Sequence, residues 1–267
     1  MRRKPVSPAA RGDRLFAPLA ADYAAARPPY PRAVFDQLRS RVEEGRAGQV
    51  TPLVVDVAAG TGIATVGLLG SGLRVAVIEP AIRMLLEAVK SLAGRPGLTG
   101  AIAARAEGLP LRGSSVAGVV VAQAFHWLDP RPALDEFARV LEPRGMLLLL
   151  WNVTEPSAFT RAVRKLVERH NPGRKRPVTP RMRETPASLR HHPAFELEPT
   201  VTIEHHRALP CDDYVRYARS WSYVGGALSP PALDLFESEL RGVLERHARH
   251  GCVEERFETV AHFARRL

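Results

Sequence analysis

The sequence predicts an α/β protein built on a doubly wound, mostly parallel β-sheet. Segments that are apolar throughout alternate with segments of helical periodicity over the first 152 residues. Such strands are typical of parallel sheets that are covered by helices on both faces. A length of 267 residues, with 45% hydrophobic and 25% charged residues, also suits one large domain carrying an elaboration.

The elements of this sheet are expected in a regular order. The first helix is predicted over residues 33–44 and the first strand over 53–58. The next helix-forming segments are 64–71, 81–93 and 132–141, and the next strands are 74–80, 100–104, 116–123 and 145–151. In helix 81–93 we place Ile82, Leu85, Leu86 and Val89 on one apolar face.

After Trp151 the pattern becomes irregular. A Pro- and Arg-rich loop is expected over 171–186, then a strand near 195–205, helices near 211–221 and 231–249, and a last strand near 256–265. The sequence therefore predicts three parts. They are a disordered basic tail (1–13), a ligand-binding core (14–152), and a substrate-selecting α-helical or irregular lid with the closing strands of the same sheet (153–267).

The net charge of +10 is unevenly distributed. Residues 1–14 carry +4 and residues 161–192 carry +8, which leaves −2 for the rest of the chain. The segment 161–192 is either a solvated basic face or a site for an anion. No apolar run suffices to cross a membrane and the first residues lack a secretory pattern, so we expect a cytoplasmic protein. The two cysteines and the paired histidines fit no metal spacing, and no metal is expected.

The most informative motif follows the first strand. In VVDVAAGTG, Asp56 is followed by Gly60 and Gly62, which permit a sharp turn and a close approach of a ligand to the backbone. A dinucleotide site would require a third glycine where Thr65 stands, and Asp56 would repel a phosphate. Asp56 suits a ligand with a sulfonium or ammonium charge. Glu79, at the end of the second strand, suits the hydroxyls of a ribose.

Five motifs together resemble the class I S-adenosylmethionine (SAM)-dependent methyltransferases. They are VVDVAAGTG, RVAVIEP followed by Met84 and Leu85, ARAEGLPL, AQAFHW and LEPRGMLLLLW. The resemblance covers residues 14–152 and is strongest with the small-molecule branch, which includes trans-aconitate and ubiquinone or menaquinone methyltransferase-like enzymes (the methyltransferase type 11 domain). It implies a Rossmann-like sheet of seven strands and SAM as the cofactor.

The resemblance also implies roles for individual residues. Ala58, Ala59, Gly60, Thr61 and Gly62 would hold the amino acid part of SAM, with Asp56 orienting their loop. Glu79 would hold the ribose, Pro80 and Met84 would pack on the adenine, and Arg105 and Ala106 would flank it. Ala122 and Gln123 would line the methionine side, and Tyr23 and Arg27 would cover the cofactor. Many members have Asp where Arg105 and Ala117 stand, so we expect adenine recognition through the backbone.

Residues of the acceptor site are less sharply defined. His126 follows the fourth strand and is a candidate general base or substrate orienter, and Trp127 is a candidate substrate contact. The alternative is that this pair packs the wall of the crevice. Tyr217 and Trp221 form either a substrate wall or helical core.

The function that these motifs favour is methylation of a small-molecule acceptor, with O-methylation of a hydroxyl or carboxylate preferred. Three rivals stay open. A nucleic-acid methyltransferase is disfavoured because AQAF stands where amino-methylating enzymes carry Asp/Asn-Pro-Pro-aromatic, and neither cysteine lies near the fourth strand. A SAM-binding protein that does not transfer methyl groups would share the same binding motifs. An NAD-dependent oxidoreductase is disfavoured by the missing glycine.

Overall fold

The computed structural model describes residues 26–44, 50–173 and 186–267. The predicted basic tail, Tyr23 and the centre of the Arg-rich loop lie outside these residues. Within the described residues, no helix has both the length and the apolar character that a membrane span requires.

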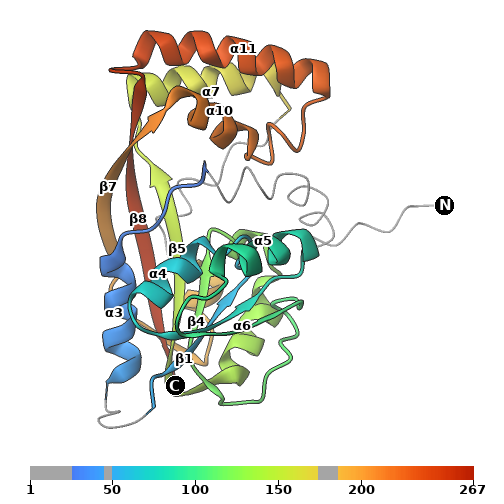
Figure 1. Cartoon of the computed structure of the whole chain (residues 1–267). Coiled ribbons are helices and arrows are strands. Elements are labelled where there is room, and N and C mark those ends of the chain that lie inside the picture. The colour runs from blue at the N-terminus through green and yellow to red at the C-terminus, as the bar shows by residue number, and fades with distance from the viewer. Residues whose placement is uncertain (1–25, 45–49, 174–185) are drawn as a thin grey trace, which may run out of the picture.

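One mixed sheet of eight strands runs through the molecule (Figure 1). The strands are β1 (Leu53–Val57), β2 (Arg74–Ile78), β3 (Leu98–Ile102), β4 (Val116–Ala122), β5 (Leu141–Thr154), β6 (Phe195–Leu197), β7 (Val201–Pro210) and β8 (Cys252–Arg266). Their spatial order is β3-β2-β1-β4-β5-β8-β6, with β7 also paired to β8. The five strands from β3 to β5 are parallel to one another, whereas β8 runs antiparallel to β5, β6 and β7. The predicted doubly wound, mostly parallel sheet is confirmed.

Helices cover both faces of the sheet. The first face packs against α3 (Arg32–Glu43), α4 (Ile63–Gly70) and α5 (Ile82–Leu92). The second packs against α6 (Pro130–Val140), the short 3-10 helix η2 (Phe125–Trp127) and α9 (Ala187–Arg190). Each inner strand is buried on both faces, which explains why segments such as LVV (53–55) and VVVA (119–122) read as continuous apolar runs.

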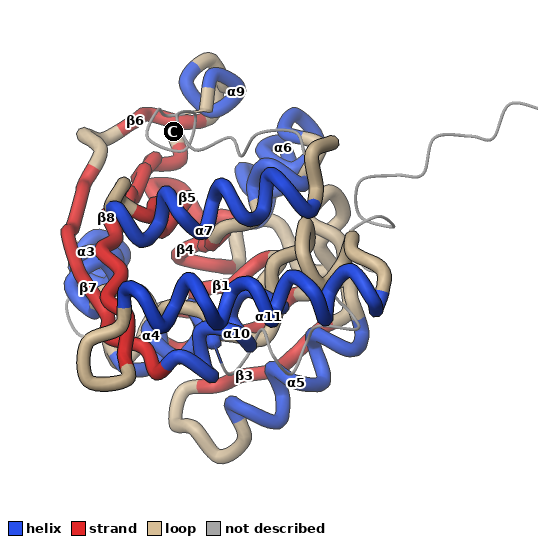
Figure 2. The backbone as a smooth tube through the Cα atoms, turned by 90° about the horizontal axis from the view of Figure 1, so that it is seen from above, coloured by secondary structure: helices blue, strands red, loops and turns tan. Residues whose placement is uncertain are grey.

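A separate layer of helices lies at one end of the long strands. It consists of α7 (Ala158–His170), α10 (Cys211–Arg219) and α11 (Pro230–His247), which share a third apolar core. Figures 1 and 2 show these helices beyond the ends of β5, β7 and β8, above the ends of the parallel strands that carry the predicted motifs. We call α7, α10 and α11 the helical layer.

The predicted apolar face of α5 is wrong except at Leu85. Ile82, Leu86 and Val89 are exposed, while the buried side consists of Met84, Leu85, Ala88 and Leu92. Both sets recur at helical spacing, so periodicity alone does not tell which set faces the sheet. In the structure the second set faces the sheet, because Leu85, Ala88 and Leu92 share one apolar core with Val75 and Val77 of β2.

Three further differences concern the region after Trp151. Helix α7 lies where the sequence analysis expects an irregular basic segment. The single strand expected near 195–205 is two strands, β6 and β7, which pair with successive parts of β8, so the sheet has eight strands instead of seven. Finally, β5 and β8 extend beyond their predicted limits and carry the chain to the helical layer.

Candidate functional site

The turn after β1 has an unusual backbone. Ala58, Gly60 and Gly62 have positive φ angles of 54°, 59° and 82°, and Gly62 is the N-cap of α4. A Cβ atom on Gly62 would lie 2.9 Å from Cδ1 of Leu92, so both the angle and the space favour glycine there. Ala58 adopts a conformation that costs a non-glycine residue energy, as often occurs at functional sites.

Glu79 ties this turn to the next strand. Its Oε2 accepts a hydrogen bond of 2.9 Å from the Gly60 amide, and its Oε1 accepts one of 2.9 Å from the Ala81 amide. The side chain is only 7% exposed and lies just beyond the end of β2. The acidic residue and the glycine turn, which the sequence placed in separate motifs, are therefore in direct contact at the carboxyl edge of the sheet.

Asp56 lies beneath the turn and is completely buried. Its Oδ2 accepts a 2.6 Å hydrogen bond from the hydroxyl of Thr65. Burial raises the pKa of Asp56 from 3.8 to about 7, the bond from Thr65 opposes the rise, and the negative charge of Glu79 adds to it. Thr65 occupies the position where a dinucleotide site would have its third glycine, so its hydroxyl gives a structural reason for the missing glycine.

Two buried oxygen atoms at this turn have no hydrogen-bond partner within the described part of the chain. They are Oδ1 of Asp56 and Oγ1 of Thr61. Buried polar atoms without partners are uncommon and costly. A carboxylate oxygen and a hydroxyl at a glycine turn fit the polar amino acid portion and positive charges of SAM.

The loop after β3 supplies the side wall of the predicted adenine site. Ala106 is buried, whereas Arg105 is exposed and pairs with Glu107 at 3.3 Å. Glu107 also accepts a hydrogen bond from the Asp129 amide at the start of α6. Met84 is buried on α5, and Pro80 lies between Glu79 and that helix. Among the described contacts, the Arg105 guanidinium pairs with Glu107.

The end of β4 is bound to the neighbouring β5. Gln123 has a positive φ of 58°, its amide donates to the Leu150 carbonyl at 2.8 Å, and its Nε2 donates to the Asn152 carbonyl at 3.1 Å. The adjacent Ala122 is half-buried. These bonds fix the predicted methionine side of the site.

His126 and Trp127 form the 3-10 turn after β4, with their ring centroids 5.2 Å apart. His126 is exposed, yet desolvation by the surrounding protein lowers the pKa of His126 from 6.5 to about 4. A ring with this pKa is neutral at physiological pH. It is therefore better suited to forming hydrogen bonds than to accepting a proton.

Arg27 leads from the N-terminal segment to the helical layer. Its Nε and Nη2 donate to the side chain and carbonyl of Ser220, both at 3.1 Å, and its guanidinium lies 5.6 Å from the ring centroid of Tyr217. Tyr217 and Trp221 are 6% and 7% exposed and pack against each other in the core of the helical layer. Their burial favours the core-packing alternative for these two aromatic residues.

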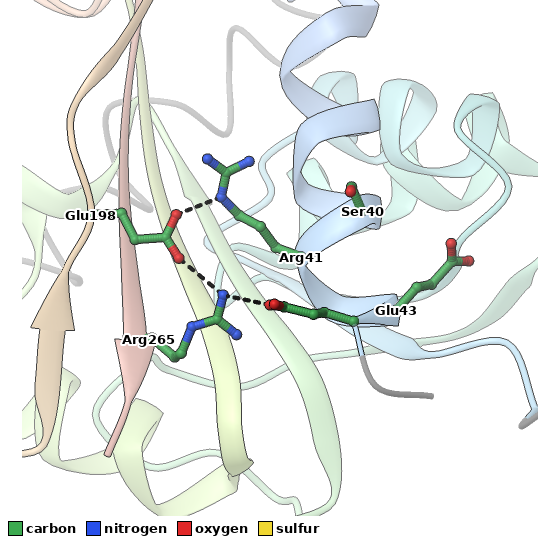
Figure 3. Close-up of a pocket in the computed structure, with 6 residues that line it drawn as sticks. Ser40, Arg41, Glu43, Glu198 and Arg265 are labelled. Atoms are coloured by element: carbon green, nitrogen blue, oxygen red, sulfur yellow. Dashed lines mark hydrogen bonds and ion pairs between the residues drawn. The ribbon is translucent and has the colours of Figure 1, made fainter. Parts of the chain in front are cut away.

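A shallow depression elsewhere on the surface is lined by charged residues (Figure 3). Arg41 on α3 pairs with Glu198 at 2.6 Å, and Arg265 on β8 pairs with both Glu198 and Glu44 at 3.1 Å. These charges neutralise one another. None of the residues predicted for the site lines this depression.

The basic segment 161–192 does not gather its charges around the turn. On α7, Arg161, Arg164 and Lys165 are exposed, and Arg169 pairs with Glu239 of α11 at 3.0 Å. Residues 174–185, the most basic part, lie outside the described residues. In the described part, the solvated-face alternative accounts for the contacts. No group of three His, Cys, Asp or Glu residues in the described ranges is arranged to hold a metal ion.

The strand order, the glycine turn and the acid that contacts it define the class of this domain. They are the features of a class I SAM-dependent methyltransferase domain, and the comparison with known proteins agrees. Residues 55–149 match the family model described as "Methyltransferase domain", and this segment is a methyltransferase domain of that class.

The relatives that match this sequence are described as uncharacterized methyltransferases. An uncharacterized methyltransferase of Mycobacterium tuberculosis is 38% identical over 133 residues, which is 50% of each chain. An uncharacterized methyltransferase-like protein of Schizosaccharomyces pombe is 31% identical over 157 residues, or 56% of each chain. The chain thus spans about half the length of the curated relatives it matches.

Solved structures share the fold over a longer stretch. A candidate type II methyltransferase from Anaeromyxobacter dehalogenans has a TM-score of 0.66 at 23% identity and covers 90% of this chain and 97% of its own. The [4+2]-cyclase SpnF has a TM-score of 0.54 at 16% identity, covering 98% and 97%. At these identities the likeness concerns the fold alone.

Proposed function

We propose that this protein transfers a methyl group from SAM to an oxygen atom of a small-molecule acceptor. The observation that carries the proposal is the junction of β1 and β2, where the Glu79 carboxylate bonds to the backbone of the glycine turn above the buried Asp56. Ligands of doubly wound sheets bind outside the carboxyl ends of the strands, which is where this junction lies.

Each part of SAM finds suitable groups there. Glu79 would exchange its bond to the Gly60 amide for bonds to the ribose hydroxyls. The backbone of Ala58, Ala59, Gly60, Thr61 and Gly62, with the two unpartnered oxygens of Asp56 and Thr61, would hold the amino acid portion. The buried Met84 and Ala106, with Pro80, would enclose the adenine. Bound in this way, SAM supplies an electrophilic methyl group on a positively charged sulfur.

The acceptor would lie beyond the end of β4. Ala122 and Gln123 would line the side of the site nearest the sulfur, and His126 and Trp127 would orient the acceptor. Methyl transfer requires an oxygen aligned with the bond that breaks, so holding the two reactants in line contributes most of the acceleration. With its pKa lowered to about 4, His126 acts in this proposal as a hydrogen-bonding orienter.

Calorimetric titration tests the cofactor site. SAM and S-adenosylhomocysteine should both bind the wild-type protein. Glu79→Ala removes the acceptor of two backbone amides and of the ribose hydroxyls, so we expect SAM affinity to fall at least about tenfold, as charge-assisted bonds contribute about 1.5–3 kcal/mol each. Gly60→Arg should abolish binding, and Glu196→Ala, at an exposed position on β6, should leave it unchanged. Unchanged affinity in both site variants would contradict the assignment.

Incubation with labelled SAM and a small-molecule cell extract tests the reaction. We expect label in one or a few compounds below about 1 kDa, identified by mass spectrometry, and release of S-adenosylhomocysteine. Bound SAM without S-adenosylhomocysteine under any condition would favour a SAM-binding protein that does not methylate. Label in RNA or DNA instead of small molecules would favour a nucleic-acid methyltransferase.

A further inference from the structure

A chain of polar side chains crosses the antiparallel half of the sheet just beyond the parallel strands. Asn152 on β5 pairs in register with Thr259 on β8, and His205 reaches them from β7. Because Leu150 pairs with Ala122, the last residue of β4, Asn152 lies two residues beyond the carboxyl end of β4. This row of polar side chains therefore begins at the edge of the sheet where the acceptor is proposed to lie.

The hydrogen bonds of this chain have only one consistent direction. The Asn152 Nδ2 donates to the Pro29 carbonyl at 3.1 Å, so Oδ1 of the amide must be the other atom. That Oδ1 lies 2.6 Å from the Thr259 hydroxyl, which donates its single proton there. The Thr259 oxygen, 2.9 Å from the His205 Nε2, must then accept from that nitrogen.

This direction determines the tautomer of His205. A neutral imidazole that carries its proton on Nε2 has an unprotonated Nδ1. Among the described residues, Nδ1 of His205 has no hydrogen-bond partner. Stacking on Phe257, with ring centroids 5.3 Å apart, also limits rotation of the ring. His205 is half-buried, so part of the residue is exposed.

The surroundings keep the imidazole neutral. Burial lowers the pKa of His205, and the positive charges of His206 and Arg207 lower it further. Arg207 lies on the same face of β7 and is paired with Glu255 of β8 at 2.9 Å, whereas His206 points to the opposite, exposed face. A second contact ties the chain to the cofactor side, because the Asn152 carbonyl accepts a bond from Gln123.

We propose that His205 is the general base of the methyl transfer and that the acceptor group is a hydroxyl. This inference rests on the proposed function. The acceptor O–H proton passes to Nδ1 of His205 while the oxygen forms its bond to the methyl carbon. The bond from that carbon to the sulfonium sulfur breaks, and its electron pair stays on sulfur. The imidazolium then loses its proton to water. Thr259 and Asn152 are positioning residues, which hold the Nε2–H tautomer.

The first test measures the tautomer without any turnover. In the imidazole-15N-labelled full-length protein, two-bond 1H–15N correlation spectra distinguish the protonated from the unprotonated ring nitrogen. We expect His205 to show protonated Nε2 and unprotonated Nδ1, and Thr259→Val to give a mixture of both tautomers. The opposite assignment in the wild-type protein would overturn the proposal.

The second test compares two adjacent histidines. In His205→Gln, the side-chain amide still donates to Thr259 but has no titratable nitrogen. We expect its rate of methyl incorporation from labelled SAM into the small-molecule extract to fall about 100-fold or more, with unchanged SAM affinity and melting temperature. The rate of His205→Gln should also no longer decline at acidic pH. Imidazole added to the buffer should restore part of the lost rate. His206→Gln, on the exposed face, should keep a rate near that of the wild-type protein and should still show the decline at acidic pH.

The outcomes separate this inference from the function on which it rests. A wild-type protein that binds SAM but labels no compound contradicts both. If the wild-type protein transfers methyl groups and His205→Gln has the same rate and pH profile, only the role of His205 is contradicted. The chemistry of the label decides the acceptor class, because methyl esters release methanol in mild alkali and methyl ethers do not. We expect alkali-stable label; volatile label would mean a carboxylate acceptor, which needs no base, and would overturn the proposal.

Discussion

Replacing Asp56 by Asn should change how the stability of the protein depends on pH. Burial raises the pKa of Asp56 from 3.8 to about 7, an increase of about three pH units. Each pH unit corresponds to about 1.4 kcal/mol, so ionised Asp56 costs the native state about 4 kcal/mol relative to the unfolded chain. An Asn side chain can still accept the hydrogen bond from Thr65 but has no charge to bury.

Whether stability rises or falls with pH follows from the direction of the pKa shift of Asp56. The pKa of Asp56 is raised on folding, so between pH 4 and 7 the native state holds a proton that the unfolded chain has lost. The contribution of Asp56 to stability is present in full below about pH 4 and is lost as the pH rises through 7. In Asp56→Asn, this decline of about 4 kcal/mol should be absent.

Urea unfolding at intervals between pH 4 and pH 9 measures the effect. The difference in unfolding free energy between Asp56→Asn and the wild-type protein should grow in favour of the variant with rising pH and level off above pH 8. The same substitution should weaken SAM binding, because it removes the negative charge that the sulfonium and ammonium groups favour. Parallel stability curves for the two proteins over the whole range would refute the reasoning about burial.

Two further predictions concern stability, one through packing and one through a buried ion pair. Gly67→Ala places a methyl group against the ring of the fully buried Phe35, so we expect a loss of about 1–3 kcal/mol of unfolding free energy, measured by urea denaturation. Gly70→Ala, in the same helix but with open space around it, should be neutral or stabilising by up to about 1 kcal/mol; equal effects in the two variants would argue against the clash. Glu255→Gln leaves the half-buried Arg207 without its buried countercharge and should lower the unfolding free energy by about 3 kcal/mol. A melting temperature as high as that of the exposed control Glu254→Gln would show that the pair contributes little.

Sequence reasoning predicted best the parts of the candidate site that are built from residues close together in the sequence. The turn from Asp56 to Gly62 lies between a strand and a helix whose periodicities differ, and Glu79 ends the next strand. Parallel strands bring their carboxyl ends to one edge, so the contact between Glu79 and Gly60 follows from the alternation of elements. Thr65 entered the sequence analysis only as an absent glycine, because its bond to Asp56 depends on how the turn brings α4 back over the end of β1.

Helix α7 was missed although its sequence contained the signals. Ser157 and Thr160 form a reciprocal capping box, and the buried Phe159, Val163 and Leu166 follow at helical spacing. The run of basic residues drew the interpretation toward a loop. In the structure the same basic residues occupy the solvent side of an amphipathic helix, because its apolar side packs against α11 in the helical layer.

The acceptor side was least predictable because long-range strand pairing assembles it. Asn152 and Thr259 are 107 residues apart, and His205 joins them from a third strand. Nothing near His205 in the sequence distinguishes it from His206; only the alternation of side chains on β7 directs one inward and the other to solvent. The proposed cofactor contacts come from loops at the ends of consecutive parallel strands, whereas the register of β5, β7 and β8 decides which polar groups would meet the proposed acceptor. A one-residue slip of β7 would replace His205 by a side chain from the opposite face, so substitutions on these strands should alter acceptor choice while leaving SAM affinity unchanged.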